Sequence, residues 1–217
     1  MLIAALDCTG ESWSVALARG SEVLAELVCR HPRTQLRSLT PSLGEVARLA
    51  GVELSQCDRL AVTLGPGSFT GVRLGVLIAR TLAQALEKPI VGVDALQALA
   101  AGCVTQEVVV AASDVRKGEV VAAAFRAGER LTPNALLSAR DWPDWLAQQG
   151  ECLVTGNALE RYGQLPSRAR AAARPFWWVR AGQVALLARD GTEVSWSQLE
   201  PAYVRAAEVQ IHSGGSP

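Results

Sequence analysis

The chain has 217 residues, of which 49% are hydrophobic and 19% are charged. This length is enough for one large domain or two small ones with a real core. Lys and Arg together number 21, and Asp and Glu also number 21, so the formal net charge is zero. A neutral chain has no overall positive field that attracts nucleic acid, so RNA binding would need a local basic patch or a partner that carries the charge.

Cysteine usage and hydropathy indicate the compartment. The five cysteines are scattered and form no CxxC pair, which is typical of reduced thiols rather than of a disulfide framework. No apolar run approaches the roughly 20 residues of a membrane span. Asp7 interrupts the apolar start, and no basic segment precedes it, so a signal peptide is not expected. The sequence therefore predicts a soluble, cytoplasmic protein.

Three segments at the start of the chain predict strands. Residues 1–6 are apolar, and residues 13–17 and 21–29 alternate between apolar and polar side chains. Three strands in succession predict an antiparallel meander.

The rest of the N-terminal half alternates helices and strands. Apolar side chains at three- and four-residue steps predict a helix over residues 36–50, with Gly51 as its stop. Pro41 lies inside that helix and is expected to kink it or to mark a late start. The further expected elements, in chain order, are a strand over 60–64, a helix over 72–86, a strand over 90–93 and a helix over 95–101.

The C-terminal half begins with strands again. Residues 108–113 and 119–125 flank a polar turn and predict a hairpin. We expect a short helix over 182–189 and a disordered tail near 212–217. A meander followed by alternating helices and strands, occurring twice, predicts two related α/β lobes. The expected lobes are residues 1–104 and residues 105–217.

The most distinctive segment is GPGSFTGVRLG, residues 65–75. It lacks the lysine that a P-loop places after its last glycine, and its glycines are one position out of register for a Rossmann turn. A tight turn is the better interpretation, because Gly65 and Gly67 permit positive φ angles and Pro66 stiffens the chain. Ser68 or Thr70 can then cap the following helix.

That helix carries small residues at every fourth position, Gly71, Gly75, Ala79 and Ala83. Glycine inside a helix costs about 1 kcal/mol relative to alanine. A stripe of this kind indicates that another backbone approaches closely. The pattern leaves open whether that backbone belongs to this chain or to a partner.

The glycine motif resembles the signature of the bacterial TsaB family, also called YeaZ. These proteins are non-catalytic relatives of the threonylcarbamoyl transferase TsaD. Further segments resemble family motifs in the same order, and Ala158 stands where the family usually has glycine. These segments are residues 6–9, 89–93, 114–120, 154–158 and 201–205.

The resemblance implies a two-lobed fold of the actin, Hsp70 and sugar-kinase (ASKHA) type. It implies a scaffold role in forming N6-threonylcarbamoyladenosine (t6A) at position 37 of tRNA. The scaffold pairs with a TsaD-type transferase through helices of its N-terminal lobe, an ATPase of the TsaE type joins the complex, and the scaffold alone can form a homodimer. The expected partner surface comprises Leu36, Leu39, Leu43, Gly71, Arg73, Gly75, Ala79 and Ala83.

A nucleotide site is the second expectation. In the actin-like fold the first hairpin begins with an acidic residue near metal-bound phosphate, and Asp7 and Thr9 fit this position. With Gly65, Gly67 and Ser68 they form a vestigial site, at which weak ATP or ADP binding is allowed and no cofactor is required. The alternative is a small actin-fold ATP-binding enzyme, an ATPase or kinase.

Other catalytic sites lack support. The chain has only two histidines, His31 and His212, and no HxxxH pair, so we expect no metal site. The sequence around Ser68 is not the GxSxG of a serine hydrolase. We therefore expect no catalytic residue in this chain.

One basic and aromatic cluster surrounds residues 176–178. It is either a surface that stacks RNA bases or, as we favour, an aromatic core flanked by solvated arginines. The arginines are Arg168, Arg170, Arg174 and Arg180.

Overall fold

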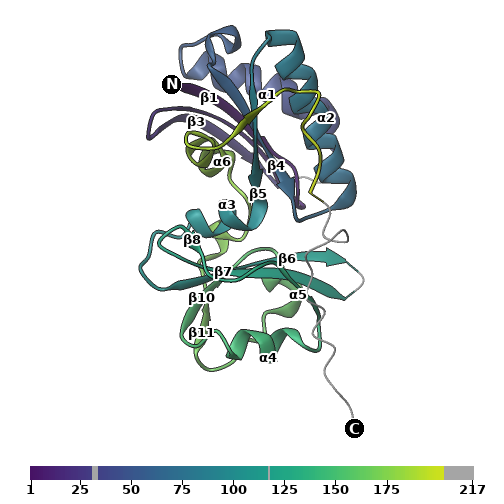
Figure 1. The fold of residues 1–217 in the computed structure, drawn as a ribbon, viewed down its shortest axis with the longest axis vertical. Helices are drawn as coiled ribbons and strands as arrows, with labels where there is room; N and C mark the ends of the chain where they lie inside the picture. The colour runs from purple at the N-terminus through teal and green to yellow at the C-terminus, as the bar shows by residue number, and fades with distance from the viewer. Residues whose placement is uncertain (31–33, 117, 203–217) are drawn as a thin grey trace.

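The structure is a computed structural model that describes residues 1–30, 34–116 and 118–202 (Figure 1). Two six-stranded sheets lie one above the other along the long axis, and each sheet forms the centre of one lobe. The mixed α/β composition and the two lobes confirm the predicted fold class. The expected disordered tail, 212–217, lies outside the described residues.

The N-terminal sheet combines an antiparallel meander with a parallel part. Its strand order is β12-β5-β4-β1-β2-β3, with β1, β2 and β3 antiparallel and β1, β4 and β5 parallel. The predicted meander is therefore confirmed. The bounds are β1 Leu2–Asp7, β2 Trp13–Arg19, β3 Glu22–Cys29, β4 Arg59–Gly65, β5 Ile90–Asp94 and β12 Glu193–Val194.

The C-terminal sheet is built around the predicted hairpin. β6 and β7 pair antiparallel, and the strand order is β11-β10-β6-β7-β8, with β9 also paired to β7. The bounds are β6 Val108–Arg116, β7 Glu119–Arg126, β8 Glu129–Arg130, β9 Ala135–Ser138, β10 Cys152–Thr155 and β11 Ala169–Ala171.

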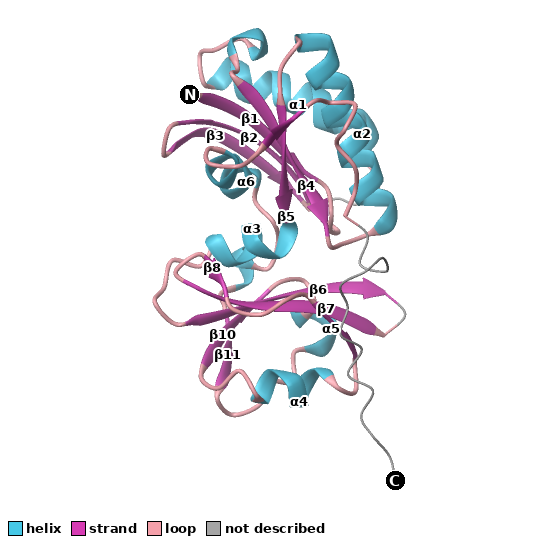
Figure 2. Ribbon diagram, viewed as in Figure 1, coloured by secondary structure: helices cyan, strands magenta, loops and turns pink. Residues whose placement is uncertain are grey.

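Helices cover both faces of the N-terminal sheet. Side chains of α1 and α2 share one apolar core with the sheet, whereas α3 and α6 lie between the two sheets and contribute to a second core (Figure 2). Gly51, with φ of +67°, follows α1 and confirms the predicted stop. The helices are α1 Gln35–Leu49, α2 Phe69–Leu86, α3 Ala95–Ala101, α4 Trp142–Ala147, α5 Leu159–Tyr162 and α6 Ala181–Ala188, with 3₁₀ turns at Leu54–Gln56 and Arg174–Phe176.

The end of the described chain returns to the N-terminal lobe. α6 packs on β1 and β2, and β12 pairs with β5. Arg59 of β4 fixes this return, because its guanidinium donates to the carbonyl of Ala188 at 2.9 Å and pairs with Glu193 at 2.5 Å. The expected division at 104/105 is therefore wrong for this segment, which completes the N-terminal sheet.

α2 is the one helix among the described residues that is long and apolar enough to cross a membrane, with 18 residues and a mean hydropathy of 1.2. A core helix meets the same two criteria. One face of α2 is buried against the N-terminal sheet, as six fully buried residues show.

Candidate functional site

The glycine turn lies directly against the turn that joins β1 to β2. A Cβ atom added at Gly67 would lie 2.4 Å from the Thr9 carbonyl oxygen, and one added at Gly71 would lie 2.1 Å from that of Cys8. The Ser68 amide donates to the same Thr9 carbonyl at 2.6 Å. The motif therefore serves close packing.

The turn chemistry matches the sequence in part. Gly65 has φ of +111°, as predicted, and the Ser68 hydroxyl accepts from the Gly71 amide at the start of α2. Gly67 does not have a positive φ, so this expectation is wrong. Gly67 is required by the contact with Thr9 instead.

The stripe of small residues is part of the core. A Cβ at Gly75 would lie 3.1 Å from Cys8 Sγ and 3.6 Å from a Val62 methyl group, and Ala79 and Ala83 have no exposed surface. The stripe lets α2 approach β1 and β4 of its own lobe. The prediction that Gly71, Gly75, Ala79 and Ala83 contact a partner is therefore wrong.

Two further residues of the expected partner surface are also buried. Leu39 and Leu43 of α1 are each 1% exposed and belong to the same core, so they too are corrections to the prediction. Leu36 and Arg73, in contrast, lie on the surface.

The solvent-facing side of α2 carries two large apolar side chains in its first half. Phe69 and Leu77 are 59% and 61% exposed, and Leu36 at the start of α1 is 72% exposed. The Arg73 guanidinium lies 3.9 Å above the Phe69 ring. The first residues of α1 and α2 line one cavity, so the two helix starts lie close together. We call Leu36, Phe69, Arg73 and Leu77 the α1–α2 face.

That cavity is the cleft between the lobes, with a volume of about 650 Å³. Arg161 pairs with Asp114 at 3.3 Å, and the Asn157 amide oxygen accepts from the Asp114 backbone. The positive charge of Arg161 in the cleft wall is therefore already paired with a carboxylate. The N-terminal lobe supplies Thr9, Gly10, Glu11, Gln35, Ser68, Thr70, Gly71 and Leu74, and the C-terminal lobe supplies Asp114, Asn157 and Arg161.

Asp7 lies beneath this cleft and does not line it. One carboxylate oxygen accepts from the hydroxyls of Thr9 at 2.8 Å and Thr63 at 2.5 Å, and from the Thr9 amide. The other oxygen is buried and has no hydrogen-bond partner among the described residues. Burial raises the pKa of Asp7 to about 6, although the threonine hydrogen bonds lower it in part.

The expected nucleotide site is thus only partly assembled. Thr9 and Ser68 face the cleft, whereas Asp7 and Gly65 are buried and Gly67 packs on Thr9. A magnesium ion held through Asp7 does not fit this arrangement, because the carboxylate is sealed from the cavity. Cys8 offers no reactive thiol either, since burial raises its pKa and Sγ donates to the Gly71 carbonyl.

Within residues 1–30, 34–116 and 118–202, no group of three or more His, Cys, Asp or Glu side chains could hold a metal ion. Both histidines, His31 and His212, lie outside that part of the chain.

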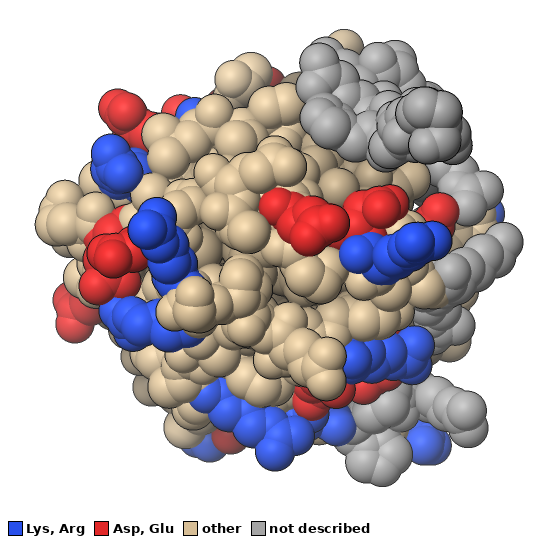
Figure 3. Space-filling model, turned by 90° about the horizontal axis from the view of Figure 1, so that it is seen from below, with Lys and Arg blue, Asp and Glu red and all other residues tan. Residues whose placement is uncertain are grey.

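The arginines around residues 176–178 are mostly paired. Arg170 contacts Glu107 at 2.6 Å, Arg174 contacts Glu160 at 3.4 Å, and Arg180 pairs with Glu26. Figure 3, which views the molecule from the end of the C-terminal lobe, shows blue and red side chains interspersed there. These ion pairs favour the interpretation of an aromatic core with solvated arginines.

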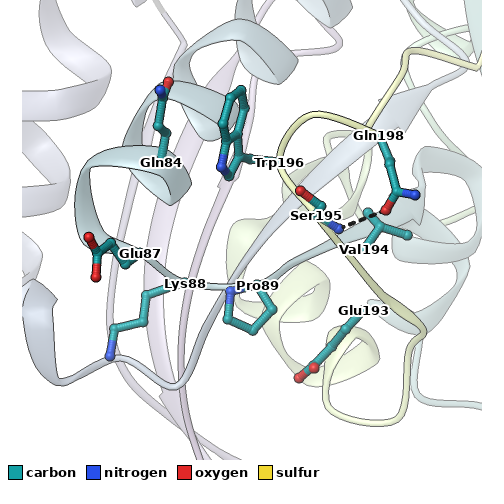
Figure 4. A pocket seen from close by; sticks show the side chains of 9 residues that line it. All are labelled: Gln84, Glu87, Lys88, Pro89, Glu193, Val194, Ser195, Trp196 and Gln198. Atoms are coloured by element: carbon teal, nitrogen blue, oxygen red, sulfur yellow. Dashed lines mark hydrogen bonds between the residues drawn. The ribbon is translucent and has the colours of Figure 1, made fainter.

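A second hollow lies at the far end of α2 (Figure 4). Its volume is about 680 Å³, and its walls come from the end of α2 and the residues after it, and from β12 and the segment that follows β12. Figure 4 shows Gln84 and Trp196 at the same end of the hollow, and the Ser195 amide donates to the Gln198 side chain. Glu87, Lys88 and Glu193 give the hollow mixed charge. The described side chains that line it therefore do not form a set of like groups that could bind one ligand.

The fold and the interlobe cleft define a two-lobed α/β protein of the actin, Hsp70 and sugar-kinase class. The ethanolamine utilization protein EutJ from Carboxydothermus hydrogenoformans shares this fold, with a TM-score of 0.54 and 14% identity over 85% of this chain and 88% of that chain. YeaZ from Pseudomonas aeruginosa superposes with a TM-score of 0.79 and 29% identity, covering 94% of this chain and 99% of that one.

The sequence comparisons define the family. TsaB of Escherichia coli (strain K12), a tRNA threonylcarbamoyladenosine biosynthesis protein, is 38% identical over 94% of this chain and 95% of its own length. The family model of TsaD, the tRNA N6-adenosine threonylcarbamoyltransferase, matches residues 30–150. The chain belongs to the TsaB family, as its motifs indicated.

Proposed function

We propose that this chain is the non-catalytic scaffold of a cytoplasmic assembly that forms N6-threonylcarbamoyladenosine at position 37 of tRNA. Its relatives are named for this biosynthesis, and residues 30–150 match the model of the transferase itself. The observation that carries the proposal is the exposed apolar surface of α2, whose opposite side is anchored in the core.

The α1–α2 face has the properties of a protein interface. Phe69, Arg73 and Leu77 follow one another at steps of four residues, so they form one stripe along the helix. Large exposed apolar side chains that adjoin one another are characteristic of partner surfaces, and aromatic and arginine side chains are enriched at their energetic centres. The buried stripe on the other side of α2 holds this surface rigid.

The occupant that we propose for this face is a TsaD-type transferase. Because the transferase model matches this chain, the partner has a related lobe with corresponding helices. Two related lobes that meet through the same helices form a nearly two-fold arrangement. The same face supports a homodimer of this chain in the absence of the transferase, and a TsaE-type ATPase completes the assembly.

The remaining roles follow from charge and from the cleft. We propose that tRNA is bound mainly through the complex, since the chain is neutral and Arg170, Arg174 and Arg180 are paired with carboxylates. We propose that no cofactor is required. The alternative, an ATP-binding enzyme, would be favoured by micromolar binding of Mg–ATP that is lost when Asn157 in the cleft is replaced by alanine.

A charge placed in the α1–α2 face tests the proposal. We expect Leu77→Arg to weaken binding of a purified TsaD-type subunit by at least about 30-fold, because an interface centre typically contributes 2 kcal/mol or more. Leu77 is exposed, so the thermal midpoint of the variant should match that of the parent. Isothermal titration with the two purified subunits measures the loss.

Val104→Arg is the matched control. Val104 is 99% exposed and lies between α3 and β6, away from the α1–α2 face, so this variant should bind within twofold of the parent chain. Parent-like affinity of Leu77→Arg would contradict the proposed interface. Threonylcarbamoyl transfer by the isolated chain would contradict the non-catalytic role.

A further inference from the structure

The two lobes share one apolar core. Side chains of β1 and β2 from one sheet and of β6 and β7 from the other belong to a single cluster, together with α3 and α6 between them. Figure 2 shows both helices in this intermediate layer. A core that continues across the boundary resists separation of the lobes, but it does not by itself fix their rotation.

The second crossing of the chain between the lobes is held by a buried hydroxyl. Ser14 of β2 has no exposed surface, and its Oγ donates to the Val179 carbonyl at 3.3 Å and accepts from the Ala181 amide at 2.9 Å. The Ser14 side chain of the N-terminal lobe thus binds the backbone on both sides of residue 180. The Ala181 amide therefore reports on opening at this crossing.

An arginine from the N-terminal lobe spans the boundary on the side of α5. Arg30, which follows β3, places its guanidinium 3.7 Å from the centroid of a Trp178 ring. The same group pairs with Glu160 of α5 at 3.0 Å. A cation over an aromatic face together with an ion pair is directional, because both contacts need the planar guanidinium in one orientation.

A second arginine spans the boundary from the C-terminal lobe to the N-terminal lobe. Arg130 of β8, in the C-terminal lobe, pairs with Asp94 at the end of β5 at 3.0 Å. Its guanidinium also lies 4.7 Å from the Phe125 ring centre. β8 is an edge strand of the C-terminal sheet, whereas α5 follows β10 near the other edge. The two ion pairs therefore lie toward opposite edges of that sheet.

We propose that Arg30 and Arg130 are a pair of clamps that hold the lobes at a fixed opening of the cleft. Two-lobed proteins commonly close around a ligand by hinge rotation. Here a rotation that relaxes one of these contacts strains the other, because they lie toward opposite edges of the C-terminal sheet. The two lobes therefore move as one rigid body, so the width of the cleft and its orientation relative to the α1–α2 face stay constant.

Hydrogen exchange of the parent chain and an Arg30→Met/Arg130→Met variant tests the clamps. Methionine keeps the apolar stem and removes the charge. We expect the Ala181 amide to exchange about tenfold faster in the variant, which corresponds to about 1.4 kcal/mol and to the usual strength of two partly exposed ion pairs with their cation–π contacts. Each single variant should give a smaller acceleration.

Two comparisons keep the test specific. Arg48→Met removes an ion pair within α1, with Glu45 at 2.6 Å, and should leave Ala181 exchange unchanged. Raising the salt concentration should accelerate Ala181 exchange in the parent and not in the double variant, because salt screens these half-exposed pairs. Unchanged Ala181 exchange in the double variant would overturn the proposal, as would an equal acceleration of all core amides, since that is global destabilisation.

Discussion

Replacing Gly71 by alanine is expected to destabilise the N-terminal lobe strongly. The new Cβ would lie 2.1 Å from the Cys8 carbonyl oxygen, and the contacted atom is backbone. No rotamer change relieves this contact, so α2 must move away from the turn between β1 and β2. The same movement breaks the Cys8 Sγ hydrogen bond to the Gly71 carbonyl, which is 3.0 Å long. We expect a loss of more than about 3 kcal/mol in the free energy of unfolding, at the upper end for overpacked sites.

Gly44→Ala is the matched control for this substitution. Gly44 lies inside α1, and an added Cβ meets nothing within 4 Å. Alanine is favoured over glycine in a helix by up to about 1 kcal/mol, so this variant should be more stable than the parent. Urea unfolding followed by circular dichroism measures both. If Gly71→Ala unfolded at the parent's urea concentration, the close packing of the glycine motif would be wrong.

Gly75→Leu distinguishes the core stripe from an interface stripe. Because Gly75 faces Cys8 Sγ and a Val62 methyl group, we expect the variant to unfold rather than to lose only its partner. A folded Gly75→Leu protein that failed to bind the transferase would restore the original interpretation of the stripe as a contact surface.

The sequence alone could not decide whether this stripe contacts its own chain or a partner, and the reason is physical. A run of small residues shows that some backbone comes close, but it does not identify that backbone. The order strand, helix, strand around the motif contained the missing signal. β4 and β5 are parallel, and the helix of a parallel crossover must cover its own sheet. The apolar residues on the outer side of α2, Phe69 and Leu77, are then the ones available to a partner.

Local periodicity predicted most of the fold. The β1–β3 meander, the β6–β7 hairpin and helices α1, α2, α3 and α6 follow from spacing and turn residues. The return of β12 to the N-terminal sheet did not, because a two-residue strand has no periodicity of its own. The ion pair of the nearly buried Arg59 with Glu193 fixes that return, and a pair separated this far in sequence gives no local pattern.

The candidate site was predictable in part. Thr9 and Ser68 do face the cleft. Asp7 does not, because Thr9 of the β1–β2 turn and Thr63 of β4 enclose its carboxylate. The sequence identifies Asp7 as the acidic residue at the end of β1. Whether Asp7 is buried, however, depends on how closely the glycine turn packs over Thr9. The C-terminal wall, with Asp114, Asn157 and Arg161, was not predicted as part of the site. Residues 114–120 and 154–158 resembled family motifs, but their distance in sequence from Thr9 and Ser68 gave no sign that they face the same cleft.

The burial of Asp7 gives the second large prediction, which concerns pH. Its pKa is raised from 3.8 to about 6 in the folded protein, so between pH 4 and pH 6 the folded state binds more protons than the unfolded state. The contribution of Asp7 to the free energy of unfolding therefore falls as pH rises through this window. Above pH 6 the buried charge costs up to about 3 kcal/mol, because one pKa unit corresponds to 1.36 kcal/mol.

Asp7→Asn removes this charge and keeps the shape of the side chain. Its amide oxygen can still accept from Thr9 and Thr63, so we expect the variant to be more stable than the parent at pH 7.5 and the difference to shrink toward pH 4. Urea unfolding of both proteins at these two pH values measures the difference in the free energy of unfolding. The contributions of all other titrating groups cancel in this difference, because both proteins contain them. Asp144→Asn, at an exposed position in α4, should show no comparable pH-dependent gain. Lower stability of Asp7→Asn at pH 7.5 would mean that hydrogen bonds to the ionised carboxylate outweigh its burial.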